Sequence, residues 1–208
     1  MTRSKYRIVF AKTEAMRFTG HLDLFRAWER LLRRARTPLA YSTGFHPHPK
    51  IQIGAALPLG ATGENELVDI ETDAECDAGA LTREIAEHAP PGIQVKRVLA
   101  LAPDAPGLEK LVVAGDYSAD PLEDAWPVDL PQRIERLMSA NSIPRERRGK
   151  AYDLRPRILS LALDGNILRM RLCLTPDATG RPDEVLSALD MESLPVLVKR
   201  DKLLLREP

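Results

Sequence analysis

Three of the four histidines of the chain lie within positions 20–50, beside an acid, several arginines and several prolines. His21 and Asp23 belong to a Gly-His-Leu-Asp sequence, and His46 and His48 alternate with two prolines. Residues i and i+2 of an extended chain point the same way, and a proline favours an extended conformation in the residue before it. The two imidazoles of this turn could therefore converge, and histidine is the side chain that most readily exchanges protons near neutral pH.

Three kinds of chemistry fit these residues. In a metal site, the three histidines and Asp23 would supply nitrogen and oxygen ligands of the types that zinc or iron accepts. In an RNA-processing site, a histidine would act as general base for a 2′-hydroxyl while Lys50 and the arginines stabilise negative charge. In a binding site, Phe45 and the histidines would stack on bases. A rigid proline turn with partly exposed histidines is the structural alternative.

The arginines occupy one side of an expected helix, residues 22–36. Leu24, Trp28, Leu31 and Ala35 share a stripe at the helical spacing, which predicts that they face the core. The opposite side is an arginine face broken mainly by Glu29. Arg26, Arg30 and Arg33 lie close together on it, and Arg34 and Arg36 flank them. The planar guanidinium binds phosphate bidentately and stacks on bases. The alternative is a solvated helix face on which Glu29 pairs with Arg33.

A second basic cluster lies in the carboxyl-terminal half of the chain. It surrounds Tyr152 and consists of Arg145, Arg147, Arg148, Lys150, Arg155 and Arg157. This cluster could extend a nucleic-acid track. Because Pro144, Gly149 and Pro156 interrupt it, an ordinary solvated loop explains the pattern equally well.

Charge is distributed unevenly, although the formal net charge is zero. Residues 1–60 carry eleven Lys and Arg against three acids, residues 61–131 four against sixteen, and residues 132–208 fifteen against eleven. Such asymmetry suits a protein that presents a basic surface to a polyanion. The alternative is that basic and acidic segments pair with each other.

The two cysteines, Cys76 and Cys173, lack the paired spacing of a zinc or iron–sulfur site. No apolar run approaches the roughly 20 residues that span a bilayer, and the amino terminus lacks the apolar stretch of a signal peptide. We therefore expect a cytoplasmic location and no membrane contact.

The order of expected elements occurs twice. In the first half, strands at 5–12, 51–57, 66–72 and 93–101 accompany helices at 22–36 and 77–88, and residues 39–42 are extended. In the second half, we expect strands at 110–117, 143–148, 157–163, 167–174 and 195–205, with helices at 131–140 and 182–189. The Asp-Gly-Asn sequence at 164–166 predicts a hairpin. This order predicts an α+β fold of two tandem ferredoxin-like (split βαβ) units, 1–103 and 108–208, which an extra strand could elaborate.

The sequence also resembles the radical-SAM-linked proteins, a bacterial family found fused to, or encoded beside, cobalamin-binding radical SAM proteins. The matching segments are Arg7–Lys12, Arg17–Asp23, Glu29–Arg30, Arg33–Ala35, Pro38–Ser42, Gly44–Ile51, Leu57–Gly60, Glu66, Asp153–Arg155 and Arg181–Leu186. Family members often have Ser in place of Thr19 and Asn in place of His46. The second difference disfavours a mechanism that needs both His46 and His48, and it leaves His21, Asp23 and His48 as the favoured catalytic candidates.

The resemblance implies an accessory protein that acts with a radical SAM enzyme in the modification of RNA or the ribosome. The cluster motif of radical SAM enzymes needs three cysteines, so the partner would perform the radical chemistry. We expect the chain to bind transfer or ribosomal RNA and more readily predict a non-catalytic role. The alternatives are a stand-alone histidine-dependent endoribonuclease, a metal-dependent hydrolase and a protein–protein adaptor.

The expected site residues follow from these arguments. The candidates for catalysis are His21, Asp23 and His48. The residues expected to contact nucleic acid are Arg26, Arg30, Arg33, Arg34, Phe45, His46, Lys50, Arg147 and Arg148. No metal and no cofactor is assigned to the chain.

Overall fold

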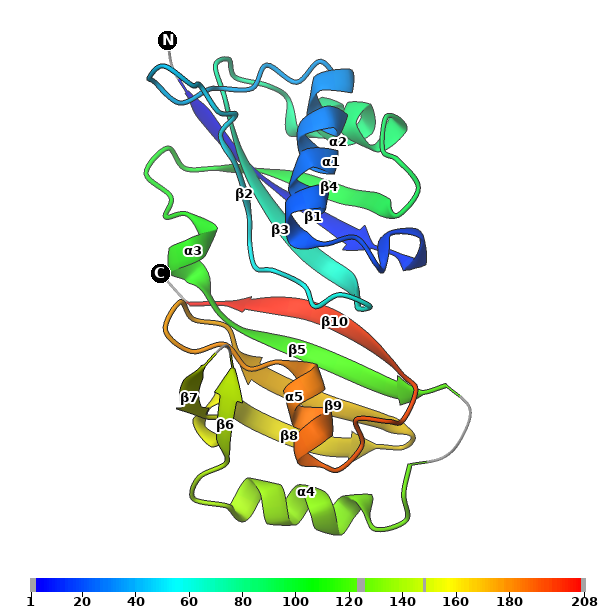
Figure 1. Cartoon of the computed structure of the whole chain (residues 1–208). Coiled ribbons are helices and arrows are strands. Elements are labelled where there is room, and N and C mark those ends of the chain that lie inside the picture. The colour runs from blue at the N-terminus through cyan, green and yellow to red at the C-terminus, as the bar shows by residue number, and fades with distance from the viewer. Residues whose placement is uncertain (1–2, 123–125, 148, 207–208) are drawn as a thin grey trace. The chain divides into compact units, whose positions relative to one another are not determined.

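The computed structural model describes residues 3–122, 126–147 and 149–206, which form a mixed α/β structure with mostly antiparallel sheet and five α-helices (Figure 1). The chain divides into two compact units, with the change from one to the other at residues 112–113. The sequence placed this change at 103–108 and therefore assigned residues 108–112 to the second unit. No helix in the described part of the chain is long and apolar enough to cross a membrane.

The first unit contains four strands and three α-helices. Their bounds are β1 (Ser4–Lys12), α1 (His21–Arg34), β2 (Ile51–Ile53), β3 (Thr62–Thr72), α2 (Ala78–Glu87), β4 (Ile93–Leu101) and α3 (Leu108–Leu111). β1 pairs with both β3 and β4, β2 pairs with β3, and these pairings are antiparallel. Residues 110–111 were expected to begin a strand, but they belong to α3.

One face of the first sheet is covered by α1 and α2. Tyr6, Ile8 and Phe10 alternate along β1 and are buried with residues of both helices in one hydrophobic core. The Phe10 and Trp28 rings meet edge to face, with their centroids 4.8 Å apart. Because alternate residues of a strand point to opposite faces, the strand pattern fixes which side the helices cover.

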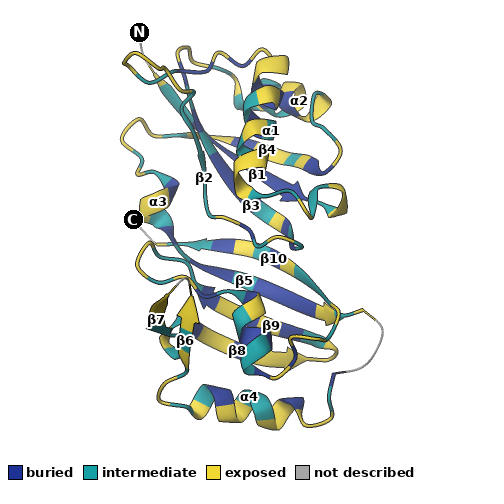
Figure 2. Cartoon of the chain, in the orientation of Figure 1, coloured by how far each residue is buried: buried dark blue, intermediate teal, exposed yellow. Residues whose placement is uncertain are grey.

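The helical spacing of residues 22–36 correctly predicted α1 and its buried side. Leu24, Trp28 and Leu31 are buried, and the helix itself runs from His21 to Arg34. Figure 2 shows exposed residues along much of the visible side of α1. Arg36 has a left-handed φ of 50°, which ends the helical path.

The start of α2 also follows the expected rule. Asp77 is the N-cap, and its Oδ1 accepts a hydrogen bond of 2.7 Å from the backbone N–H of Ala80. This bond satisfies one of the N–H groups that the first turn of a helix leaves without an intrahelical partner.

The second unit repeats the order of strand, helix, two strands, helix and strand, with an added hairpin. Its elements are β5 (Val112–Pro121), α4 (Leu130–Ser139), β6 (Pro144–Arg147), β7 (Lys150–Asp153), β8 (Ile158–Asp164), β9 (Ile167–Cys173), α5 (Pro182–Ala188) and β10 (Val196–Leu205). The sheet order is β10-β5-β9-β8. Gly165, with φ 58°, lies in the expected turn between β8 and β9. β6 and β7 form a separate two-stranded sheet, and β7 was not predicted.

Candidate nucleic-acid interface

The start of α1 is held by a buried lysine. The ammonium of Lys12 donates to the carbonyl oxygens of Thr19, Arg17 and Ala61, at 3.1, 3.3 and 3.4 Å. Only 1% of Lys12 is exposed. Lys12 thus connects the end of β1 to the segment that leads into α1. The sequence analysis did not single it out, although it continues the inward-facing positions 6, 8 and 10 of the strand.

His21, Leu22 and Asp23 form the exposed first turn of α1. Gly20 is the N-cap residue, and its carbonyl oxygen accepts a hydrogen bond from the N–H of Leu24 at 2.9 Å. The Asp23 carboxylate pairs with Arg26 at 3.3 Å. This pair is well exposed, so solvent screening makes its contribution to stability small.

The arginine face of α1, which we define as Arg26, Arg30, Arg33 and Arg34, is exposed along its length. Arg33 pairs with Glu29 at 2.6 Å, as the spacing predicted. Arg30 Nε donates to the Arg26 carbonyl at 3.2 Å, and Arg34 Nη2 donates to the His88 carbonyl at 3.0 Å. A guanidinium carries five N–H donors, so each of these arginines retains donors for a phosphate.

A groove of about 520 Å³ runs beside this face. Three members of the arginine face line it, Arg30, Arg33 and Arg34, together with the less polar residues Met16, Ala27 and Pro90. The groove therefore combines a cationic rim with an apolar floor. The sequence could not reveal it, because Pro90 lies far beyond the end of α1 along the chain and only the tertiary fold brings it beside Met16 and the helix.

The histidine turn, which we define as residues 44–49, belongs to a mostly exposed loop of the first unit. It is closed by two hydrogen bonds of 2.9 Å, from the Ser42 N–H to the His48 carbonyl and from the His48 N–H to Ser42 Oγ. Gly44 has a φ of 129°, a conformation that favours glycine. Phe45 is fully exposed, and His46 is exposed as well. Both rings are accessible to a ligand, and their role in base stacking stays a prediction.

Lys50 is less accessible than the turn that precedes it. Its ammonium pairs with Glu71 at 2.7 Å, and both side chains are about two-thirds to three-quarters buried. The backbone of Lys50 also bonds to Ala40 and Glu71. A phosphate would have to compete with the Glu71 carboxylate for this lysine, which makes Lys50 a weaker candidate contact than the arginine face.

The structure does not bring the three candidate catalytic residues together. His21 and Asp23 follow the segment that Lys12 holds at one end of β1, whereas the histidine turn is joined through Lys50 to Glu71, which is opposite Lys5 at the other end. β1 has nine residues, and a strand rises about 3.3 Å per residue, so roughly 25 Å separates its ends. The course of the chain in Figure 1 agrees. His48 therefore does not share one centre with the other two residues in a single chain.

The suggested metal ligands are likewise far apart. In the ranges that the structure describes, no group of three or more His, Cys, Asp and Glu side chains is placed to hold a metal ion. The suggested set of three histidines with Asp23 is divided between the two ends of the first unit. These residues thus do not fit one metal ion in a single chain.

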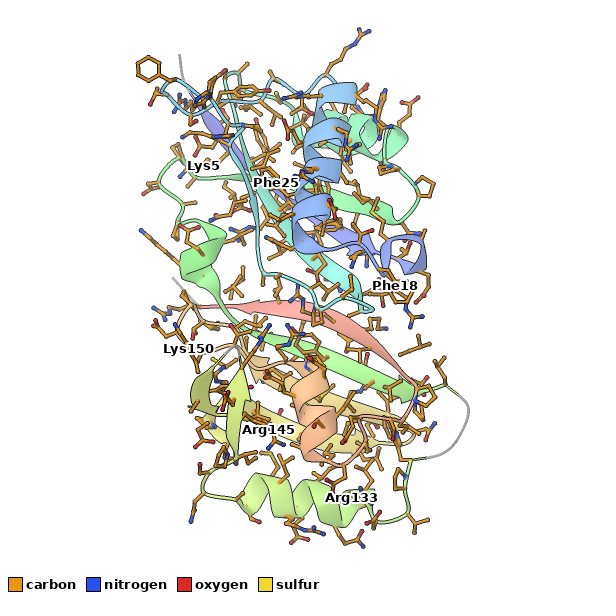
Figure 3. All side chains as sticks on the ribbon, viewed as in Figure 1. Lys5, Phe18, Phe25, Arg133, Arg145 and Lys150 are labelled. Carbon is orange, nitrogen blue, oxygen red and sulfur yellow. The ribbon has the colours of Figure 1, made fainter. Side chains whose placement is uncertain are left out.

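Part of the second basic cluster, Arg145, Arg147 and Lys150, lies in the β6–β7 hairpin. Arg147 is opposite Lys150, and Arg145 is opposite Tyr152, so the side chains of these four residues lie on one face of the hairpin. We call Arg145, Arg147 and Lys150 the hairpin cations. Figure 3 shows the Arg145 and Lys150 side chains on this element. Arg148 lies outside the described residues.

Two other arginines of the basic cluster, Arg155 and Arg157, follow the hairpin in a short 3-10 turn. Arg155 donates from Nε and Nη2 to the Met138 carbonyl and from Nη1 to the Ile158 carbonyl. The Arg157 guanidinium lies 4.0 Å from the Tyr152 ring centroid. These contacts give Arg155 a structural role and leave the hairpin cations as the accessible part.

Two pKa shifts accompany this arrangement. Burial, followed by a hydrogen bond and charge interaction with Glu184, raises the pKa of Tyr152 above its usual value. The pKa of Asp153 is lowered because its carboxylate accepts hydrogen bonds from the backbone N–H groups of Ile143 and Arg155, at 2.7 and 2.9 Å. Tyr152 is therefore neutral and Asp153 ionised at neutral pH.

The sequence model of a bacterial family, DUF2344, described as an uncharacterized protein conserved in bacteria, matches residues 5–182. The chain belongs to this family. The match extends from β1 to the first residue of α5 and therefore includes α1, the histidine turn and the β6–β7 hairpin.

Comparison with other proteins adds little to this assignment. No curated protein matches the chain. Among solved structures, an unknown protein from Galdieria sulphuraria matches over 97% of this chain and 100% of its own, with 10% sequence identity and a TM-score of 0.30. A TM-score this low does not indicate a shared fold.

Proposed function

We propose that the chain is an accessory RNA-binding protein and that the arginine face of α1 is its principal contact. The observation that carries this proposal is the exposure of four arginines on one side of a single helix. α1 contains no lysine. Guanidinium groups suit RNA because they bind phosphate through paired N–H donors and stack on unpaired bases.

The acids of α1 reduce the charge of this face without cancelling it. Asp23 pairs with Arg26, and Glu29 pairs with Arg33. Two negative charges therefore offset part of the four positive charges of the arginine face. Surface ion pairs contribute little to stability. A phosphate of the RNA can therefore replace a carboxylate partner at small cost. Neutralising that phosphate releases counterions from the RNA, which favours binding at low salt.

We also propose that the bound RNA is presented to a radical SAM enzyme, with transfer or ribosomal RNA as the substrate. This part rests on the resemblance of the sequence motifs alone. It assigns the radical chemistry to the partner, because a three-cysteine cluster motif cannot be formed by the two cysteines of this chain. The proteins would act as a complex, so they should copurify when they are produced together.

We infer that each unit is ferredoxin-like. The support is the same order of strand, helix, two strands, helix and strand in both units, once the β6–β7 hairpin is set aside. In the first unit, β1 lies between β3 and β4, and in the second, β5 lies between β9 and β10. In this interpretation the hairpin is an addition to the second unit.

An RNA-binding measurement tests the proposed function. The variant carries Ala in place of Arg26, Arg30 and Arg33, and its control carries three exposed cations of the same unit replaced by Ala, namely Arg83, Arg97 and Lys110. Both variants lose three positive charges, and alanine favours helix. We expect fluorescence anisotropy with labelled RNA to give at least a tenfold weaker affinity for the first variant and a smaller loss for the control.

Equal losses in the two variants would remove α1 as the specific contact. Binding of an acidic protein that survives nuclease treatment, with no affinity for RNA, would instead support the adaptor alternative. Defined cleavage of RNA that disappears in His21→Ala or His48→Ala would support the endoribonuclease alternative. The hydrolase alternative predicts activity that a chelator abolishes.

A further inference from the structure

The groove beside α1 has a chemical character that a backbone-binding surface does not need. Its rim consists of Arg30, Arg33 and Arg34, but its remaining lining is Met16, Ala27 and Pro90. Phosphates gain nothing from an apolar floor, because they are strongly hydrated and bind through hydrogen bonds and charge. The floor suits a flat and weakly polar group, and the rim suits phosphates joined to it.

We propose that this groove holds the base of an unpaired nucleotide and that the chain consequently selects single-stranded RNA. The inference rests on the RNA-binding function proposed above and specifies which form of RNA is bound. A base offers flat faces to the apolar floor and to the guanidinium planes, while its own and neighbouring phosphates reach the rim. In a duplex both faces of the base are covered by its neighbours, and inserting it would require unstacking.

The groove is shaped before any ligand arrives. Gly92 has a φ of 99°, and a Cβ built there would lie 2.4 Å from Cγ of Met16, so glycine permits the close approach of this methionine. The Thr13 N–H donates to the Gly92 carbonyl at 3.0 Å and ties the two segments together. Arg34 is fixed by its bond to the His88 carbonyl. Such preorganisation lowers the entropic cost of binding.

The size of the groove agrees with this occupant. Its volume of about 520 Å³ lies within the range of small-molecule sites. A single base therefore does not exceed the space that the groove offers. An acidic peptide with an aromatic residue has related chemistry, but the all-arginine rim favours phosphates and bases because guanidinium groups match both.

The test compares three RNA ligands of about 12 nucleotides at one salt concentration, since single-stranded binding sites are of this order. They are a single strand, a duplex of the same sequence, and a single strand in which abasic sugars replace the bases. With the whole chain, we expect the single strand to bind about tenfold more tightly than either of the others.

A variant that fills the groove without changing charge separates base binding from phosphate binding. Ala27→Leu adds apolar bulk to the floor, and Ala86→Leu adds the same group to the exposed side of α2 as a control. In Ala27→Leu the single strand should lose its tenfold advantage while the duplex and abasic affinities stay unchanged. The control should resemble the wild type in all three measurements.

The outcomes distinguish this inference from the proposed function. Salt-sensitive binding that is equal for the single strand, the duplex and the abasic strand would overturn base recognition but leave RNA binding intact. Absence of binding to all three ligands would overturn both. Labelled RNA can also be displaced by a competitor, either an acidic aromatic peptide or the unlabelled single strand. If the peptide displaces the RNA at the lower concentration, the groove belongs to a protein partner and the inference is overturned.

Discussion

Replacing Lys12 by methionine probes how the buried end of β1 supports α1. The ammonium donates to three carbonyl oxygens in the segments 17–19 and 61, and it is 1% exposed. Methionine has a similar length and an apolar side chain suited to a buried position, but it cannot donate a hydrogen bond. Lys12→Met therefore removes the connection between β1 and the entrance of α1 while it leaves the core nearly filled.

The expected loss of stability follows from two opposing contributions. Hydrogen bonds from a charged donor contribute about 1.5–3 kcal/mol each. The substitution also removes the cost of burying an ammonium group, which amounts to several kcal/mol. Because the carbonyls of Arg17, Thr19 and Ala61 would lose their donor, we expect a net loss of about 2–4 kcal/mol in the free energy of unfolding of the first unit.

Urea unfolding followed by tryptophan fluorescence measures this loss. The chain has two tryptophans, Trp28 in the core of the first unit and Trp126 in that of the second. A Trp126→Phe background leaves Trp28 as the reporter. With a slope of about 1–3 kcal/mol per molar urea, the midpoint should fall by about 1–2 M. Lys110→Met replaces an exposed lysine and is the control, which should leave the urea midpoint unchanged. An unchanged midpoint in Lys12→Met would refute the idea that this ammonium holds the segment before α1.

Two further predictions concern the β6–β7 hairpin. Replacing the hairpin cations by Ala should weaken RNA binding and reduce its salt dependence without changing the fold, and an unchanged affinity in filter binding would exclude the hairpin as a contact. Asp153→Ala should destabilise the second unit, because the N–H groups of Ile143 and Arg155 lose their acceptor. Since the pKa of Asp153 is lowered, its stabilisation is present above the ordinary aspartate pKa and is lost as the pH falls through the lowered value. Urea midpoints at neutral and acid pH should therefore differ less in Asp153→Ala than in the wild type.

The sequence predicted local features of α1 and α2 well. The helical spacing identified Leu24, Trp28 and Leu31 as buried, and the pair of Glu29 with Arg33 forms as expected. These features depend on residues three to four apart, whose relation a helix fixes in advance. The N-cap of α2 is equally local.

Features that join distant segments were not predictable in the same way. Residues 20–23 and 46–48 lie in one short stretch of sequence, which suggested a common catalytic centre. α1 separates the two segments in space, because the chain runs the length of this helix before it reaches the histidine turn. A helix of 14 residues is about 21 Å long, so its two ends cannot share a site. The groove formed by Met16, Ala27 and Pro90 was missed for the related reason that tertiary packing alone brings them together.

The elements missed in sequence have local explanations. β7 follows Gly149 and precedes Pro156, and these turn-forming residues favoured an irregular loop. α3 has only four residues, too few to display helical periodicity. The short strands and helices of the chain are therefore less predictable than α1.

The salt dependence of RNA affinity tests the central proposal most directly. The affinity of the wild type for single-stranded RNA is measured over a range of salt concentrations and compared with the variant in which Arg26, Arg30 and Arg33 are alanine. Each phosphate contact contributes about 0.7 to the slope of log affinity against log salt for a single strand, so loss of three contacts should make the slope shallower by about 2. Identical slopes for the wild type and the variant would contradict the assignment of phosphate binding to the arginine face of α1.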